Sequence, residues 1–130
     1  MKTILSLAII PLLFLFSFCD DTVTNEDVDS VIIPEKNVSF NQHIWPLIKM
    51  KCSSSEGCHG VDDYGGQGAV ILTSYQSIME QVVAGDPETS NLILITEGIK
   101  MHPAVPDILK LNDNQKAGIK TWVKEGAKNN

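Results

Sequence analysis

The N-terminal part of the chain divides sharply into an apolar stretch and an acidic one. Lys2 is followed by an apolar run from Ile4 to Phe18. A basic residue before an apolar run of this length is typical of a secretory signal peptide. The run is shorter than the about 20 apolar residues that a membrane-spanning helix needs. Residues 1–18 therefore predict an exported protein.

The apolar run ends on Cys19, directly before Asp20 and Asp21. A cysteine at this place resembles the lipobox of bacterial lipoproteins, in which that cysteine is acylated and becomes the first residue. Residues 19–37 are polar and acidic, which predicts an extended, solvated tether. We expect a lipoprotein in the periplasm or on the outer surface, anchored to a membrane through Cys19. The alternative is an exported soluble protein that lacks the anchor.

From residue 38 onward, apolar positions recur at helical intervals. Ser39 and Gln42 have capping-box spacing before the first such stretch, and Pro46 inside it predicts a kink or a late start. Three more helices are expected, opened by Thr73 and Gln76, by Asp86-Pro87, and by Asn112 and Gln115. Val70–Leu72 is the run most like a strand, and it is too short to organise a sheet. Residues 38–130 thus predict one all-α domain.

The helices expected in this domain are short and its loops are long, and the loop next to the second cysteine brings little apolar area of its own. The loop between about residues 53 and 72 is rich in glycine. Such a chain is easier to stabilise around an inserted apolar group than around its side chains alone. The net charge of the whole chain is −6 and it contains no arginine, so the basic surface that nucleic-acid binding requires is absent.

Three residues carry candidate cofactor chemistry: Cys52, Cys58 and His59. Covalent haem attachment uses two thiols and a histidine directly after the second, usually in the form C-x-x-C-H. The Cys-His end of that motif is intact here, whereas five residues instead of two separate the cysteines.

Further motifs surround this one in a definite order. Val38-Ser39-Phe40 precedes the cysteines, and the motifs that follow them are Leu72–Tyr75, Val83–Pro87 with Ser90 and Leu92, Lys100-Met101, and Leu111 with Asp113, Ile119, Trp122, Gly126 and Ala127. In this order they resemble the single-haem cytochrome c-like domains of exported bacterial proteins, and the resemblance covers residues 38–130.

The resemblance implies an all-α, cytochrome c-like fold, with short helices around one covalent haem c and the first helix packed on the last. It implies thioether bonds at Cys52 and Cys58, His59 as the proximal iron ligand and Met101 as the distal one. His102 departs from the family pattern and is the alternative distal ligand, which would give a bis-histidine haem of lower potential.

Histidine–methionine ligation lets iron change oxidation state without an open coordination position. The resemblance therefore implies a monomeric electron carrier that serves redox partner proteins and is not an enzyme. Three alternatives stay open from the residues themselves. One is a haem-free binding or structural module with a Cys52–Cys58 disulfide. The others are a zinc site, which lacks a fourth ligand at suitable spacing, and an enzyme such as a haem peroxidase, which requires an open distal position.

Overall fold

The computed structural model describes residues 25–53, 59–60, 70–103 and 107–130, and this part of the chain is all-α. The elements are α1 (Asn25–Ser30), a π-helical turn η1 (Phe40–Ile44), α2 (Trp45–Lys51), α3 (Tyr75–Met79), α4 (Asn91–Thr96), a 3₁₀ turn η2 (Asp107–Leu109) and α5 (Asp113–Lys124). The predicted helical class is confirmed for these residues, and Val70–Leu72 is not a strand. The predicted signal peptide and Cys19 lie outside the described residues.

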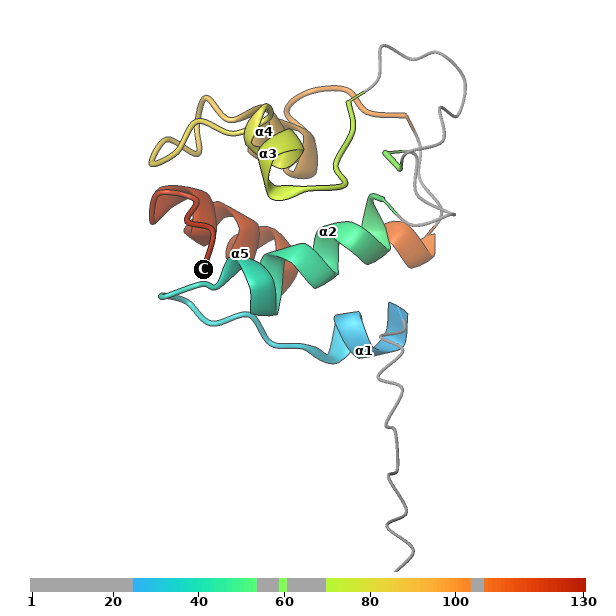
Figure 1. Ribbon diagram of the computed structural model, residues 1–130. Coiled ribbons are helices and arrows are strands. Elements are labelled where there is room, and N and C mark those ends of the chain that lie inside the picture. The colour runs from blue at the N-terminus through green and yellow to red at the C-terminus, as the bar shows by residue number, and fades with distance from the viewer. Residues whose placement is uncertain (1–24, 54–58, 61–69, 104–106) are drawn as a thin grey trace, which may run out of the picture.

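Helices α2 and α5 form the centre of the domain, with α3 and α4 on one side and α1 on the other (Figure 1). The ring of Phe40 lies 5.5 Å from that of Trp122 on α5, centroid to centroid, and 5.1 Å from the ring of Tyr75. Trp122 is completely buried, and its indole N–H donates to the carbonyl of Lys128 at 3.0 Å. The first helical segment of the domain therefore packs on the last one, which is the contact that the sequence leads us to expect.

Pro46 accounts for the two-part construction of the first helix. Proline has no backbone N–H, and it lies in the first turn of α2, where helical donors have no partner within the helix. The residues before it form the π-helical turn η1, capped by Ser39, whose hydroxyl accepts from the N–H of Gln42 at 3.3 Å. Nδ1 of His43 accepts from the N–H of Ser39 at 3.0 Å, which gives this histidine a structural role.

The capping box that opens α5 joins Asn112 and Gln115, as predicted. The box that opens α3 is formed by Ser74 and Ser77, one residue later than the predicted pair at 73 and 76. Threonine and serine both cap helices well, so spacing alone does not choose between adjacent hydroxyl residues.

Helix α4 begins at Asn91, later than the start predicted at Asp86-Pro87. The reason is Ser90, which is fully buried. Its hydroxyl oxygen accepts from the N–H of Val83 at 2.8 Å, and its hydroxyl lies 2.8 Å from the carbonyl of Asp86. These bonds hold residues 83–90 in turns, so the helix starts only after Ser90.

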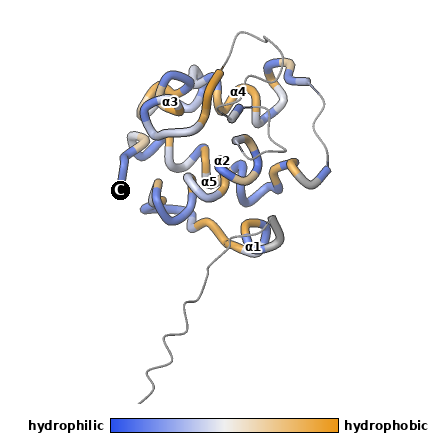
Figure 2. The backbone as a smooth tube through the Cα atoms, turned by 45° about the vertical axis from the view of Figure 1, so that its right-hand side comes forward, coloured by the Kyte–Doolittle hydropathy of each residue, from blue (hydrophilic) through white to orange (hydrophobic). Residues whose placement is uncertain are grey.

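Residues 25–37 fold onto the domain, which differs from the extended tether predicted for residues 19–37. Val28 in α1 and Ile33 after it are each 4% exposed. The run that follows α1 is hydrophobic (Figure 2). Ile33 packs against Gly118 of α5, where an added β-carbon would lie 2.5 Å from Cγ2 and 2.8 Å from Cβ of Ile33. Although the segment is acidic in composition, two of its apolar residues, Val28 and Ile33, belong to the core.

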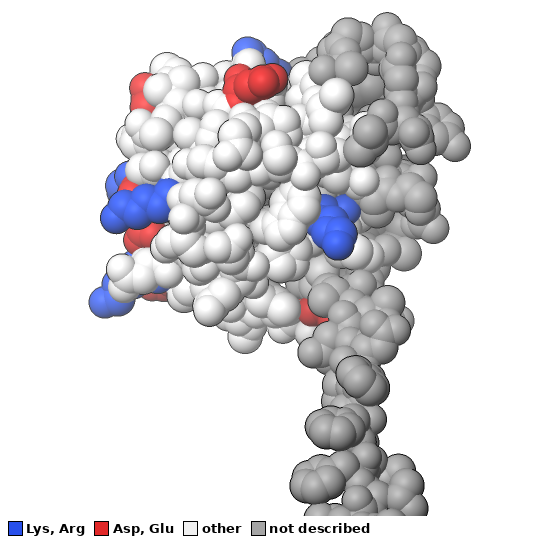
Figure 3. All heavy atoms as spheres, in the orientation of Figure 1, with Lys and Arg blue, Asp and Glu red and all other residues white. Residues whose placement is uncertain are grey.

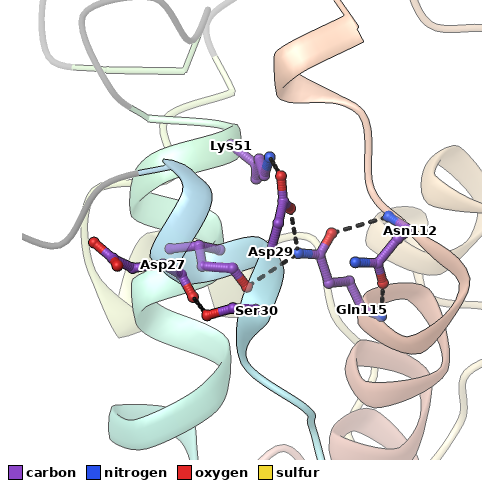
Figure 4. A network of polar contacts seen from close by, with 7 residues as sticks. Asp27, Asp29, Ser30, Lys51, Asn112 and Gln115 are labelled. Carbon is purple, nitrogen blue, oxygen red and sulfur yellow. Dashed lines mark hydrogen bonds and ion pairs between the residues drawn. The ribbon is translucent and has the colours of Figure 1, made fainter.

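A polar network joins α1 to the centre of the domain (Figure 4). Nζ of Lys51 donates to one oxygen of Asp29 at 2.9 Å, and Nε2 of Gln115 donates to the other at 2.9 Å. The Lys51 side chain is almost completely buried, whereas that of Asp29 is 46% exposed. The hydrogen bond from Lys51 holds the pKa of the Asp29 carboxyl below its ordinary value.

None of the helices in the described part of the chain is long and apolar enough to span a membrane.

We predict that Gly118→Ala destabilises the domain by about 1–3 kcal/mol, because the new methyl group would collide with Ile33. Helix propensity alone favours alanine over glycine, so the expected sign is opposite to the intrinsic preference. The measurement is chemical denaturation. Ala117→Gly, at the exposed neighbouring position on α5, is the matched control and is expected to cost about 1 kcal/mol at most. A Gly118→Ala variant as stable as the wild type would contradict the packing of residues 25–37.

We expect Asp29→Asn to cost about 1 kcal/mol near neutral pH, a modest value because water screens the half-exposed carboxylate. The folded-state pKa of Asp29 is depressed, so its contribution is present above the ordinary value of 3.8 and is lost as the pH falls through the lower folded-state value. Urea denaturation of both proteins from neutral to acidic pH measures this. A stability difference that does not shrink in acid would show that the ion pair is not its source.

Candidate functional site

A cavity of about 430 Å³ lies between the end of α2, helix α4 and the segment around η2. Its volume falls within the range of about 300–1,000 Å³ that is typical of cofactor and ligand sites. Three separate parts of the chain supply the apolar lining, which includes Val70, Leu72, Leu92, Ile95, Leu109 and Leu111. The cavity therefore offers apolar walls that an inserted group could complete.

Cys52 and His59 both line this cavity. Cys52 ends α2, where its N–H donates to the carbonyl of Ile48 at 2.9 Å. The N–H of His59 donates in turn to the carbonyl of Cys52 at 3.0 Å. The first cysteine of the predicted attachment motif and its histidine are thus joined directly by a backbone hydrogen bond, in a motif of unusual length.

The segment Val70–Leu72 holds His59 in place. Nδ1 of the His59 ring lies 2.8 Å from the carbonyl oxygen of Val70. The N–H of Leu72 donates to the carbonyl of His59 at 3.0 Å, and the hydroxyl of Ser53 donates to the carbonyl of Leu72 at 2.6 Å. A carbonyl oxygen only accepts, so Nδ1 carries the hydrogen and Nε2 of the neutral ring keeps its lone pair.

His102 faces His59 from the opposite side of the site. The two Nε2 atoms are 3.5 Å apart and the ring centroids 5.8 Å apart. Nδ1 of His102 lies 2.8 Å from the carbonyl oxygen of Pro103, so this ring also carries its hydrogen on Nδ1. Of the two candidate distal ligands, His102 lines the cavity, whereas Met101 is 97% exposed and does not belong to the lining.

Burial changes the chemistry of the Cys52 thiol. Cys52 is a free cysteine, and desolvation raises its pKa to about 11. The thiol is therefore protonated and weakly nucleophilic at neutral pH. Cys58, the second predicted attachment residue, lies outside the described residues.

Three lysines line the cavity: Lys51, Lys110 and Lys116. None of the described lining residues is acidic. Lys110 also pairs with Asp107 at 2.6 Å. On the face seen in Figure 3, by contrast, charges of both signs are mixed and lie mostly toward the edges. A group with carboxylates in this cavity would meet Lys116, as well as Lys51 and Lys110, whose charges Asp29 and Asp107 already offset. Sequence reasoning missed these lysines, because a net negative chain gives no signal that its lysines gather at one site.

No protein-family model matches this chain, and neither a curated protein nor a solved structure does. Among the described residues, no group of three or more His, Cys, Asp or Glu side chains is placed to hold a metal ion.

The raised pKa of Cys52 predicts slow alkylation of this residue in the folded, haem-free protein. A pKa that moves from 9.0 to about 11 reduces the thiolate fraction about a hundredfold at about pH 8. Mass spectrometry of the Cys52 peptide after timed iodoacetamide treatment measures the rate, with the same protein in concentrated guanidinium chloride as control. Equal rates in the two samples would contradict the burial of Cys52.

Proposed function

We propose that this protein is an electron carrier of the cytochrome c type, which holds one haem c in the cavity at the end of α2. One observation carries the proposal: Cys52 and His59, which the resemblance assigns to haem attachment, contact each other and line the same apolar cavity. In this proposal the chain is exported, is anchored to a membrane through Cys19 and exchanges electrons with redox partner proteins.

The described residues fit this cofactor in three respects. Apolar side chains cover the walls of the cavity. The His59 ring keeps Nε2 available while Nδ1 donates to the Val70 carbonyl, which is how metal-ligating histidines are usually oriented. Lys116 in the lining suits a carboxylate of the haem, because charge-assisted hydrogen bonds are among the stronger ones, whereas Lys51 and Lys110 already pair with Asp29 and Asp107.

A bound haem would supply a one-electron couple whose potential depends on its axial ligands and on its exposure to water. In this proposal the chain orients His59 and excludes water from the haem through Val70 and the leucines that line the cavity. Lys116 in the lining offsets a carboxylate of the haem. Residues 101–102 would supply the second iron ligand, for which the resemblance assigns Met101. Iron held by two protein ligands would leave no open position for a substrate, and so we propose a carrier rather than an enzyme.

The desolvation of the Cys52 thiol has a consequence for assembly. A thiol whose pKa is raised to about 11 reacts poorly at neutral pH. In our proposal the thioether bond at Cys52 therefore forms before the chain closes around the cavity.

We expect the protein, expressed with a c-type maturation system, to gain the mass of one haem. Cys52→Ser combined with Cys58→Ser is expected to abolish covalent attachment, because both candidate thiols are then absent. Cys19→Ser removes a cysteine outside the domain, so it is the matched control and should retain the haem mass.

Intact-mass spectrometry reads all three proteins. A wild-type protein without haem, two hydrogens lighter than its reduced form, would contradict the proposal. It would indicate the haem-free module with a Cys52–Cys58 disulfide instead.

A further inference from the structure

We propose that His102, and not Met101, is the second iron ligand, which would make the cofactor a bis-histidine haem of low potential. This inference rests on the proposed function and concerns the same cavity. It starts from the pairing of the two Nε2 atoms, which lie 3.5 Å apart.

With both rings neutral, their hydrogen bonds to the backbone leave no hydrogen between the two Nε2 atoms. Each Nδ1 lies 2.8 Å from a backbone carbonyl oxygen, that of Val70 for His59 and that of Pro103 for His102. In the neutral rings both Nε2 atoms are then acceptors, and neither can donate to the other. Two lone pairs that face each other at this distance repel, and a cation between them turns the repulsion into two bonds.

The separation is close to that of two opposed ligands of one metal ion. Metal–imidazole bonds of about 2.0–2.1 Å place two opposed nitrogens about 4 Å apart. The observed 3.5 Å is short of that distance by roughly half an ångström, which a small movement of the 101–103 segment would supply. Two protein ligands are enough for haem iron, because the porphyrin occupies the remaining four positions.

Of the two neighbouring residues 101 and 102, only His102 faces the cavity. The N–H groups of Ile99 and Lys100 both donate to the carbonyl of Leu94, which ties the start of the loop to α4. Residues 101–103 form neither a helix nor a strand, and the side chains of residues 101 and 102 take different sides of the loop. His102 lines the cavity, and Met101 is accordingly 97% exposed.

The identity of this ligand affects the redox chemistry. A methionine thioether raises the reduction potential of haem iron relative to a second imidazole. With His102 as the ligand, the protein is suited to partners of lower potential than those of a histidine–methionine cytochrome.

The test compares the haem-loaded wild type with Met101→Leu, His102→Met and His102→Ala. The readouts are a potentiometric titration and the absorption spectrum of the oxidised protein, in which a methionine–iron bond gives a weak band in the red. Ile99→Ala is the matched control, since Ile99 is exposed and lies in the same loop.

We expect the wild type to lack the methionine band and Met101→Leu and Ile99→Ala to leave spectrum and potential unchanged. His102→Met should gain the band and shift to a higher potential, and His102→Ala should gain binding of added imidazole at the vacated position. A wild-type methionine band that disappears in Met101→Leu would overturn this inference and leave the proposed function standing. A wild-type protein that takes up no haem would instead overturn the proposed function.

Discussion

The hydrogen bond between the His59 ring and the Val70 carbonyl, 2.8 Å long, is the contact on which the site depends. It determines which ring nitrogen keeps its lone pair, and it brings the segment Val70–Leu72 beside the end of α2. The backbone bonds from Leu72 to His59 and from His59 to Cys52 follow the same path. One wall of the cavity, the orientation of the candidate ligand and the position of the candidate thiol therefore arise from a single set of contacts.

The packing of the first helical segment of the domain on the last one supports the residues that form the cavity. Phe40, Tyr75 and Trp122 form its aromatic centre, and full burial of a side chain such as Phe40 contributes about 1.5–3 kcal/mol. Lys51 connects the cavity with α1, since it lines the cavity and its Nζ donates to Asp29 of α1. Residues 25–37 are thus part of the support of the site, and not only a connection to the N-terminal region.

The sequence predicts the helical class, the capping of α5 by Asn112 and Gln115, and the break at Pro46, because local propensity decides these features. It misplaces the start of α4, since the buried hydroxyl of Ser90 overrides the Asp-Pro signal through bonds to Val83 and Asp86. It also predicts a solvated tether where Ile33 packs on Gly118, because composition does not reveal a contact with a distant helix. At the site, the resemblance to cytochrome c-like domains, and not the spacing of the cysteines, predicts Cys52 and His59 as partners. The placement of His102 over Met101 depends on tertiary geometry, and no local pattern encodes it.

We propose that the apolar cavity beside Cys52 and His59 holds a redox-active haem. The most direct measurement is a reduced-minus-oxidised absorption spectrum of the mature, folded protein, recorded through a complete cycle of reduction and reoxidation. Our account predicts the sharp bands of a c-type haem, appearing and disappearing reversibly in one one-electron step. A folded protein that shows no visible absorption in either state would contradict it.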